Sequence, residues 1–429
     1  MVRHRGIAAS VASAKLRGMT EATETAVLAA IDGAAIARDV SRLVRAVSVT
    51  GDERAAVEAL AAIAAAHDVV ARVDVHDLEA VRAAPGYPGE EAPRAELVGL
   101  TATLPGAGPR RLCLNGHLDV VAPGAAAWVH PPFSGVIGDG VVHGCGSLDM
   151  KGGVVAALHA MAAVRRVAGR APAEVVLQAV ASEEDGGLGT FAALEADDRF
   201  DACLIPEPTA FDVVVAHAGA LTFTGTVTGV SAHAAVRLEG VSALDRYIPI
   251  HQALQSHERA VNADVAHPLM APLALPYPLL VGRIQAGTWS SRVPDELVFE
   301  GRLGVRVGED PAQARAALER VVAAADDGAG PPAAITWTGG QFASAETPVD
   351  HPFVTLVQAA AREECGAADL VGVPYGADMR LFTQRGIPCV LFGPPGLERA
   401  PAADEYVVVE DLVRIARAIA RTILRFGRG

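Results

Sequence analysis

The sequence predicts an α/β protein with a mostly parallel central sheet and a second, smaller α+β domain inserted into it. Two apolar strands at 111–115 and 174–180 are separated by an apolar helix at 154–167, and each strand runs into polar residues. Near-continuous apolar strands joined by a helix are typical of a parallel sheet covered on both faces. From about residue 212 the apolar residues alternate instead with period two, which predicts antiparallel strands.

The N-terminal quarter is expected to be helical. Apolar residues recur at helical spacing over 26–47 and 52–67, and Thr50-Gly51-Asp52 between them reads as a stop and restart. Residues 80–92 are rich in Pro, Gly and charge, which predicts a loop. Residues 1–18 are basic but lack the apolar stretch of a secretory signal, so we expect a loose extension there.

The later elements define where the two domains divide. A strand at 202–205 continues the first sheet, whereas 213–228 and 292–307 alternate. We therefore expect residues 1–211 and 336–429 to form the larger, discontinuous domain and 212–335 the inserted one. Further elements are expected as helices at 244–262, 311–325, 352–364 and 410–425, and as a buried strand at 387–392.

Composition narrows the class of partner. The 429-residue chain has a formal net charge of −14 and a pI of about 5.4, so it offers no basic footprint for nucleic acid or an anionic membrane. No apolar run reaches the roughly 18 residues that span a bilayer. The five scattered cysteines form no CxxC pair, which disfavours a disulfide framework and a thiolate zinc site. We expect a cytoplasmic protein with a small-molecule partner.

Acidic and imidazole side chains gather where the predicted strands end. His117 and Asp119 follow the first strand, Glu183 and Glu184 the second, and Glu207 the third. Ligands of parallel sheets collect at the carboxyl ends of the strands. The glycine-rich stretch 144–153 adds Asp149 at a sharp corner before the helix at 154–167.

This set of side chains suits a hydrolytic metal centre. His117, Asp149, Glu184 and Glu207 supply the imidazole and carboxylate ligands that zinc and manganese take. Asp119 can accept the second N–H of the imidazole, which leaves Glu183 as a general base. Each residue alone has a plainer interpretation: Asp149 as a helix cap, His117 as a hydrogen-bonded core histidine, and the glutamates as solvated surface. Their joint placement at successive strand ends favours the metal centre.

Several motifs in the same order resemble the M20 family of metal-dependent amidohydrolases, which contains acetylornithine deacetylase, succinyl-diaminopimelate desuccinylase and glutamate carboxypeptidase. The likeness runs over roughly residues 110–410. It rests on Asn115-Gly116-His117-Leu118-Asp119, Gly146-Ser147-Leu148-Asp149-Met150-Lys151-Gly152-Gly153, Ala181-Ser182-Glu183-Glu184-Asp185, Pro206-Glu207-Pro208, Gly229-Val230-Ser231-Ala232-His233 and Tyr375-Gly376-Ala377-Asp378-Met379-Arg380.

The resemblance implies a zinc-peptidase-like catalytic domain with an inserted lid through which two subunits dimerise. It implies a first metal on His117, Asp149 and Glu207, a second on Asp149 and Glu184, and Glu183 as the base. It also implies that His233 in the lid reaches a neighbouring subunit's active site and stabilises the oxyanion. Arg302 lies near where family members grip a substrate carboxylate, and Arg292 competes for that role. The expected ion is Zn, Mn or Co.

One departure from the family pattern bears on the number of metal ions. The last family ligand is a histidine four residues before a glutamate, and Pro401 occupies that place before Glu405. Proline cannot bind a metal, so the second ion should be weak. Three outcomes stay open: a hydrolase with one ion, a site completed by a chelating substrate, or a metal-poor binding protein. A labile single ion also suits a branch resembling 5-nitroanthranilate aminohydrolase, which displaces an amine from an activated aromatic ring.

Overall fold

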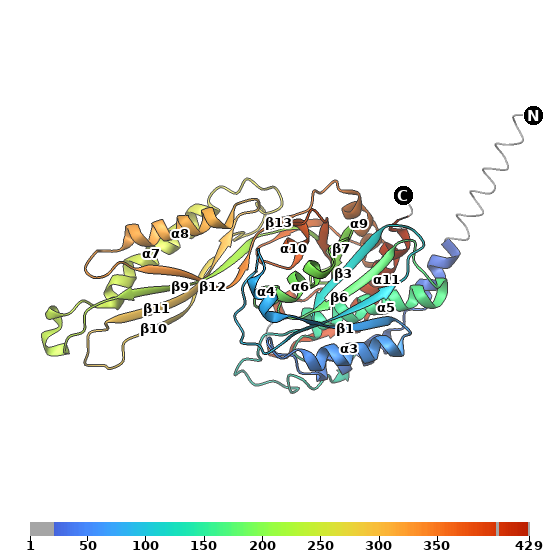
Figure 1. Cartoon of the computed structure of the whole chain (residues 1–429), viewed down its shortest axis with the longest axis horizontal. Coiled ribbons are helices and arrows are strands. Elements are labelled where there is room, and N and C mark those ends of the chain that lie inside the picture. The colour runs from blue at the N-terminus through green and yellow to red at the C-terminus, as the bar shows by residue number, and fades with distance from the viewer. Residues whose placement is uncertain (1–20, 400–402, 428–429) are drawn as a thin grey trace, which may run out of the picture.

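The computed structural model describes residues 21–399 and 403–427. Within these residues a nine-stranded mixed sheet forms the larger body, and a four-stranded sheet extends from one end of it (Figure 1). The strands of the large sheet are β1 (Val70–His76), β2 (Leu97–Leu104), β3 (Arg111–His117), β6 (Glu174–Val180), β7 (Ala202–Ile205), β8 (Val213–His217), β13 (Ala345–Glu346), β14 (Leu370–Val373) and β15 (Cys389–Leu391). Their order is β1-β2-β6-β3-β7-β15-β8-β13, with β14 beside β8.

The parallel part of this sheet is its centre. Strands β6, β3, β7 and β15 pair in parallel, whereas β1 and β2 on one side and β13 on the other pair antiparallel. All four residues of β7 are buried, as a central strand requires, while β1 alternates with exposed residues as an edge strand does. The sheet is therefore more mixed than the sequence predicts, although its central strands are parallel as expected.

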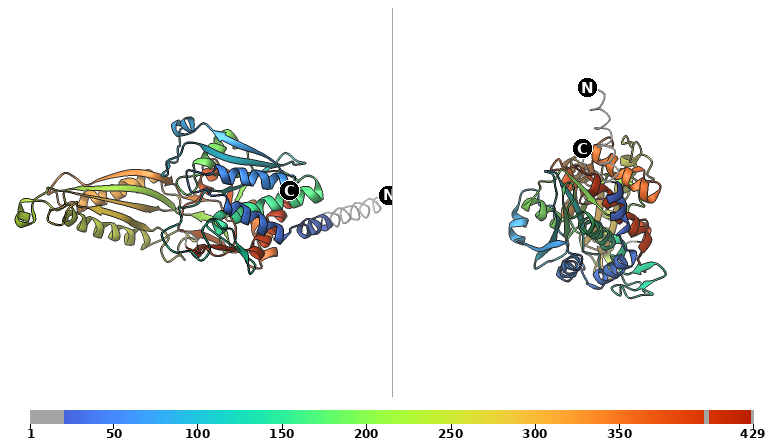
Figure 2. Two further views of the ribbon diagram at one scale, coloured as in Figure 1. Left: turned by 90° about the horizontal axis from the view of Figure 1, so that it is seen from below. Right: turned by 90° about the vertical axis from the view of Figure 1, so that its right-hand side faces the viewer.

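Helices lie on either side of the large sheet (Figure 2). The helices α2 (Gly33–Arg45), α5 (Gly152–Ala168), α9 (Pro352–Cys365) and α11 (Val409–Arg425) contact one another in one layer. Helix α5 is buried along residues 152–164, so its alanines and valines form the centre of the main hydrophobic core. Helix α3 (Arg54–Ala66) packs on β1 and β2, and α6 (Leu188–Ala196) packs on β2 and β6.

Two predicted elements near the N-terminus are corrected by the structure. The single helix expected over 26–47 is broken, because Asp32 caps α2 by accepting a hydrogen bond from the Ala34 N–H at 2.9 Å. The loop expected over 80–92 begins inside a short helix, α4 (Leu78–Ala83), which Asp77 caps. Alanine-rich sequence hid the first break. The extension expected at 1–18 lies outside the described residues.

The inserted part is an antiparallel sheet with helices on one face, and we call it the lid. Its strands β9 (Gly219–Thr228), β10 (Leu279–Ala286), β11 (Glu296–Val305) and β12 (Ala334–Phe342) take the order β10-β11-β9-β12. Helices α7 (Ala243–Asn262) and α8 (Pro311–Ala325) pack on it around their own core. The sheet begins at Gly219 and ends at Phe342, each seven residues after the divisions expected at 212 and 335, because β8 joins the large sheet and β12 runs on to Phe342.

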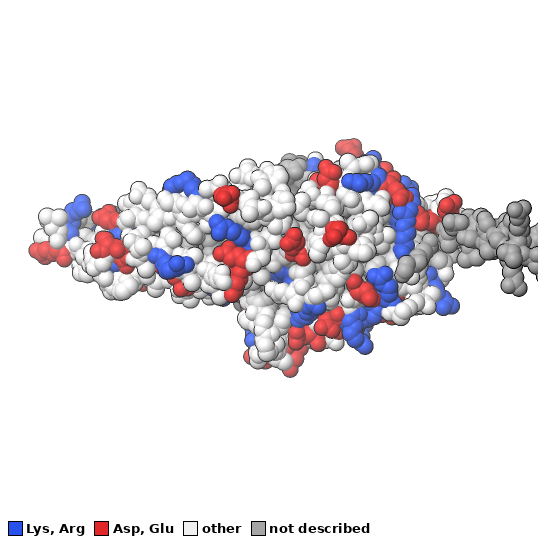
Figure 3. Space-filling view, turned by 90° about the horizontal axis from the view of Figure 1, so that it is seen from above, with Lys and Arg blue, Asp and Glu red and all other residues white. Residues whose placement is uncertain are grey.

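The surface carries charged side chains of both signs. In the face shown in Figure 3 the charged side chains of both signs are interspersed over the larger body and the lid. Of the helices in the described ranges, none has both the length and the apolar character that crossing a membrane would require.

Candidate active site

The register of the central strands places the predicted site residues at one edge of the large sheet. His117 ends β3 and lies opposite Val180, which ends β6. On the other side β3 pairs with β7, so the segment after Ile205 starts at the same edge. The segments that carry Glu183 and Glu207 therefore begin beside His117, as the sequence predicts for the carboxyl ends of parallel strands.

Asp149 reaches this edge from the turn before α5. The first turn of α5 needs glycine at Gly153, because a Cβ there would lie 2.1 Å from the Pro206 carbonyl oxygen. The close approach brings the start of α5 against the segment that carries Glu207. Gly153 is thus explained by packing between two segments of the site, whereas a Cβ at Gly152 would meet the Ser147 carbonyl oxygen at 2.4 Å.

His117, Asp149 and Glu207 form a compact cluster whose ligand atoms all lie within 4.8 Å of one another. The His117 Nε2 is 3.3 Å from an Asp149 oxygen and 3.8 Å from a Glu207 oxygen. Ligand atoms around a zinc ion at about 2.0–2.2 Å are separated by about 3.3 Å in a tetrahedral site. The donor set and its spacing therefore fit a divalent transition metal.

The tautomer of His117 also suits a ligand. Its Nδ1 lies 2.8 Å from the backbone carbonyl oxygen of Asp119, and a carbonyl can only accept, so Nδ1 donates. The neutral imidazole then has its lone pair on Nε2, facing Asp149 and Glu207. Sequence reasoning assigned this contact to the Asp119 carboxylate, which is instead 3.6 Å from Nδ1.

The Asp119 carboxylate accepts hydrogen bonds from other groups. It accepts hydrogen bonds from the backbone N–H groups of Glu183 and Glu184, each at 3.2 Å, and from the Thr50 hydroxyl. Asp119 is fully buried, and burial raises the pKa of its carboxyl. By holding the backbone of Glu183 and Glu184, Asp119 positions the segment that carries these two side chains.

Glu405 positions Asp149 in a similar way and was not among the predicted site residues. Its buried carboxylate accepts from the backbone N–H groups of Gly146 at 3.0 Å, Leu148 at 2.8 Å and Asp149 at 3.2 Å. Burial raises the pKa of Glu405 to about 7. The signal in the sequence was the glutamate of the terminal family motif, whose partner position, Pro401, lies outside the described residues.

A cavity of about 230 Å³ opens beside the cluster, between the large domain and the lid. Glu183 and Glu184 line it together with Asp149 and Glu207, and Arg302 of β11 enters it from the lid. Tyr375 and Phe342 add two aromatic walls. The structure thus brings seven of the nine predicted residues to one place: His117, Asp119, Asp149, Glu183, Glu184, Glu207 and Arg302.

His233 and Arg292 lie elsewhere. They form a β-bridge with each other, and Arg292 donates to the Ser231 hydroxyl at 2.7 Å. Both side chains are exposed on the lid beside Trp289, whose side chain is 73% exposed, and neither lines the cavity of the cluster. Among the described residues of the lid, Arg302 is therefore the positively charged one that lines the cavity beside the acidic cluster of its own chain.

Burial is the main cause of the raised pKa values of the acidic side chains at this site. Burial, with the nearby charges of Asp378 and Glu207, raises the pKa of Glu183 well above its usual range. Burial and the charge of Asp149 raise the pKa of Glu184 to about 8. Asp378 is itself paired with the buried Arg380 at 3.2 Å, and Arg380 donates to the Gly186 carbonyl at 2.6 Å. The sequence assigned this pair no role, and the charge of Asp378 contributes to the raised pKa of Glu183.

These raised pKa values predict how metal-free protein responds to pH. A carboxyl whose pKa rises from 4.5 to about 8 on folding stabilises the fold below pH 4.5, and this stability is lost as pH rises toward 8. We expect chelator-treated protein to unfold at lower temperature at pH 8 than at pH 6, and Mn²⁺ to restore more stability at pH 8. Thermal unfolding of the wild type and of the control Glu184→Gln measures this. The melting temperature of the control should change less between pH 6 and pH 8. A metal-free melting temperature that rises from pH 6 to pH 8 in both proteins would contradict it.

Comparison with known proteins places the chain in a family. Residues 113–425 match peptidase family M20/M25/M40. A succinyl-diaminopimelate desuccinylase from Methylobacterium sp. (strain 4-46) is 31% identical over 405 residues, which cover 89% of this chain and 93% of that protein. A succinyl-diaminopimelate desuccinylase from Paracoccus denitrificans (strain Pd 1222) is 28% identical over 401 residues, which cover 90% of this chain and 97% of that protein. The dipeptidase Dug1p of Saccharomyces cerevisiae shares the fold with a TM-score of 0.74 over 95% of this chain and 99% of its own, at 15% identity.

The chain belongs to the M20 family of metal-dependent peptidases and amidohydrolases. It is accordingly a metal-dependent hydrolase that acts on carbon–nitrogen bonds. The resemblance inferred from the motifs, the mixed α/β fold and the enzyme class are thereby confirmed.

Proposed function

We propose that the protein hydrolyses an amide bond in a small substrate that carries a carboxylate. The observation that supports this most is one cavity that combines the His117, Asp149 and Glu207 cluster with the buried Glu183 and the cation of Arg302. Arg302 would bind the substrate carboxylate. The volume of about 230 Å³ is below the roughly 300–1,000 Å³ of drug-sized sites, which favours a small substrate.

The residues divide the chemistry between them. His117, Asp149 and Glu207 would hold one Zn, Mn or Co ion, which as a Lewis acid polarises a carbonyl and makes water more acidic. Glu183 would take a proton from the attacking water and pass it to the leaving amine. Glu184 and Asp149 would offer an incomplete second site, so we propose one tightly held ion in each subunit.

A substrate panel tests this proposal. We expect release of primary amine from N-succinyl and N-acetyl amino acids after addition of Mn²⁺, Co²⁺ or Zn²⁺, and little from unblocked dipeptides. The aromatic walls formed by Tyr375 and Phe342 favour one further candidate, displacement of the amine of an activated aromatic ring with an adjacent carboxylate. Turnover of that compound alone would replace amide hydrolysis by this second activity, and no turnover with any ion would refute both.

The proposed weakness of the second metal site gives a direct prediction. Pro401→His would restore the imidazole that the family pattern has four residues before Glu405, so a second Mn²⁺ or Zn²⁺ should bind at least tenfold more tightly. Isothermal titration of metal-free wild type and variant measures this, with Pro395→His as the matched control. Equal stoichiometry and affinity in wild type and Pro401→His would refute the alignment of this segment.

We also propose a homodimer in which His233 of each lid completes the active site of the partner subunit. The exposed position of His233 beside Trp289 on the lid supports this. Glu183→Gln and His233→Ala should each be inactive alone. Mixed after reversible dissociation, they should regain up to about a quarter of wild-type activity, because half of the dimers are mixed and each mixed dimer has one complete site. No recovery in mixtures shown to exchange subunits would contradict a shared site.

A further inference from the structure

A second group of metal-type side chains lies outside the active site. Asp39 of α2, His67 at the end of α3 and His159 of α5 bring their ligand atoms within 4.8 Å of one another. Among the residues described here, this group and the catalytic cluster are the two that could hold a metal ion. None of the three residues lines the active-site cavity, so the group belongs to no step of the proposed reaction.

The contacts in this group converge on one oxygen. The Nε2 atoms of His67 and His159 lie 2.7 and 2.8 Å from the same Asp39 oxygen, and the two rings meet edge to face with centroids 4.4 Å apart. Two imidazoles thus point the same ring nitrogen at one carboxylate oxygen. The side chains are 23% exposed for His67, 17% for Asp39 and 6% for His159, so the group is shielded but reachable.

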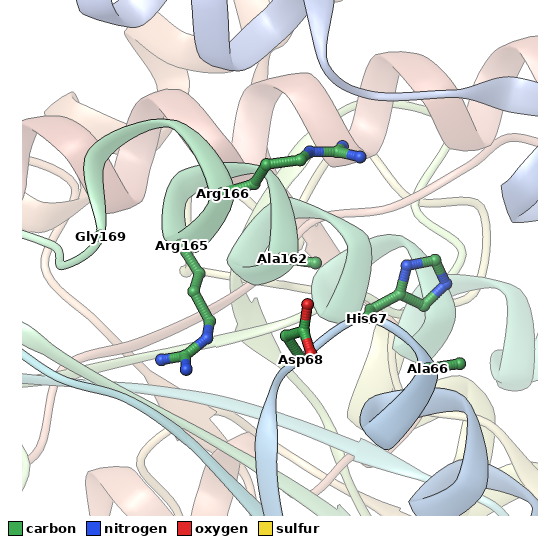
Figure 4. A pocket seen from close by; sticks show the side chains of 7 residues that line it. All are labelled: Ala66, His67, Asp68, Ala162, Arg165, Arg166 and Gly169. Atoms are coloured by element: carbon green, nitrogen blue, oxygen red, sulfur yellow. The ribbon is translucent and has the colours of Figure 1, made fainter.

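The space beside the group is open. A cavity of about 560 Å³ runs along His67 and Asp68 toward α5, where Arg165 and Arg166 lie (Figure 4). In that view Arg165 points away from His67, and the Arg166 guanidinium donates to the Ala30 carbonyl. The cavity gives an ion a route to His67 and room for water as a further ligand.

From this geometry we propose that Asp39, His67 and His159 form a second site for a divalent transition metal of the zinc class. Two imidazoles and one carboxylate are a donor set for zinc, cobalt or nickel and not for magnesium or calcium, which prefer oxygen. Ligand atoms of a tetrahedral zinc ion are about 3.3 Å apart, so the Asp39 oxygen must separate from each nitrogen by about half an ångström. Each ring would shift its proton from Nε2 to Nδ1.

An ion at this position would connect three helices that are far apart in the chain. It would tie α2 and α3 to α5, which starts three residues after Asp149. Binding to the folded state alone stabilises that state in proportion to the logarithm of the ion concentration. The site is thus structural, and its occupancy should raise the melting temperature whether or not the catalytic site is filled.

Zinc stoichiometry tests the proposal without a substrate. Full-length protein is freed of metal, mixed with excess Zn²⁺, passed through a desalting column and analysed for zinc. Wild type and the control Asp68→Asn, altered beside His67, should each retain one more zinc ion per chain than His67→Gln and Asp39→Asn. In a Glu207→Gln background Zn²⁺ should still raise the melting temperature, and adding His67→Gln should abolish that rise.

A structural measurement decides the case even where a variant does not fold. Crystals of the wild type soaked in Zn²⁺ should show an anomalous difference peak between His67 and His159. Equal zinc content in wild type and both variants, or no peak there while the catalytic cluster is occupied, would show that Asp39 only accepts hydrogen bonds from the two histidines. Loss of amide hydrolysis in the substrate panel would leave this site untouched, so the two proposals fail separately.

Discussion

Glu183→Gln is expected to lower kcat by about 10²–10⁴-fold while the fold and the metal content stay near those of the wild type. The amide keeps the size of the side chain but cannot take a proton from water. Glu183 is suited to this role because it lines the cavity beside the ligand cluster, and because Asp119 holds its backbone N–H at 3.2 Å. Steady-state kinetics and zinc analysis of the same preparations measure both effects.

The control for this variant separates chemistry from general damage. Glu195→Gln changes a glutamate of α6 whose side chain is 49% exposed and pairs with Arg385 at the surface, and such pairs contribute little. Its kcat should equal that of the wild type. A Glu183→Gln protein whose kcat is within threefold of the wild type would show that Glu183 is not the base. A Glu183→Gln protein that loses its metal would show that Glu183 takes part in metal binding.

The core of the site could be predicted because its residues lie at the ends of strands that the sequence marks clearly. His117 and Glu207 follow short apolar runs, and parallel strands carry such residues to one edge whatever the details of packing. Asp149 was found through its glycine-rich turn. The local pattern is enough in these cases because each residue is placed by its own strand or turn.

The positioning contacts could not be predicted because they are made across the fold. Which atom of Asp119 meets His117 depends on rotations that no spacing of residues specifies, so the expected carboxylate contact proved to be a carbonyl contact. Glu405 lies 256 residues from Asp149, and its contact depends on how β16 (Tyr406–Val408) pairs with β5 (Val141–His143). The break at Asp32 was missed for a simpler reason, since alanine fits every position of a helical pattern.

The peripheral group illustrates the same limit. Asp39, His67 and His159 lie on three helices, and each alone reads as an ordinary polar residue of a helix surface or end. Only the packing of α2 against both α3 and α5 brings them together. Chemistry placed by helix packing is therefore harder to find in a sequence than chemistry placed at strand ends.

Glu405→Ala is expected to destabilise the protein by about 3–5 kcal/mol and to weaken binding of the catalytic metal. The change leaves the N–H groups of Gly146, Leu148 and Asp149 without their acceptor, and an unsatisfied buried donor costs about 1–3 kcal/mol. Without those bonds the turn no longer fixes Asp149 opposite His117, so metal affinity falls together with stability.

Urea unfolding of metal-free protein and isothermal titration with Zn²⁺ measure the two losses separately. Glu405→Gln should lose less in both, because its amide oxygen replaces Oε1, which accepts from Leu148 and Asp149. Glu410→Ala, a change at an exposed position of α11, should alter stability by less than about 0.5 kcal/mol. Lost stability with unchanged zinc affinity in Glu405→Ala would mean that Asp149 is held in place by its own turn, and that Glu405 acts on the fold alone.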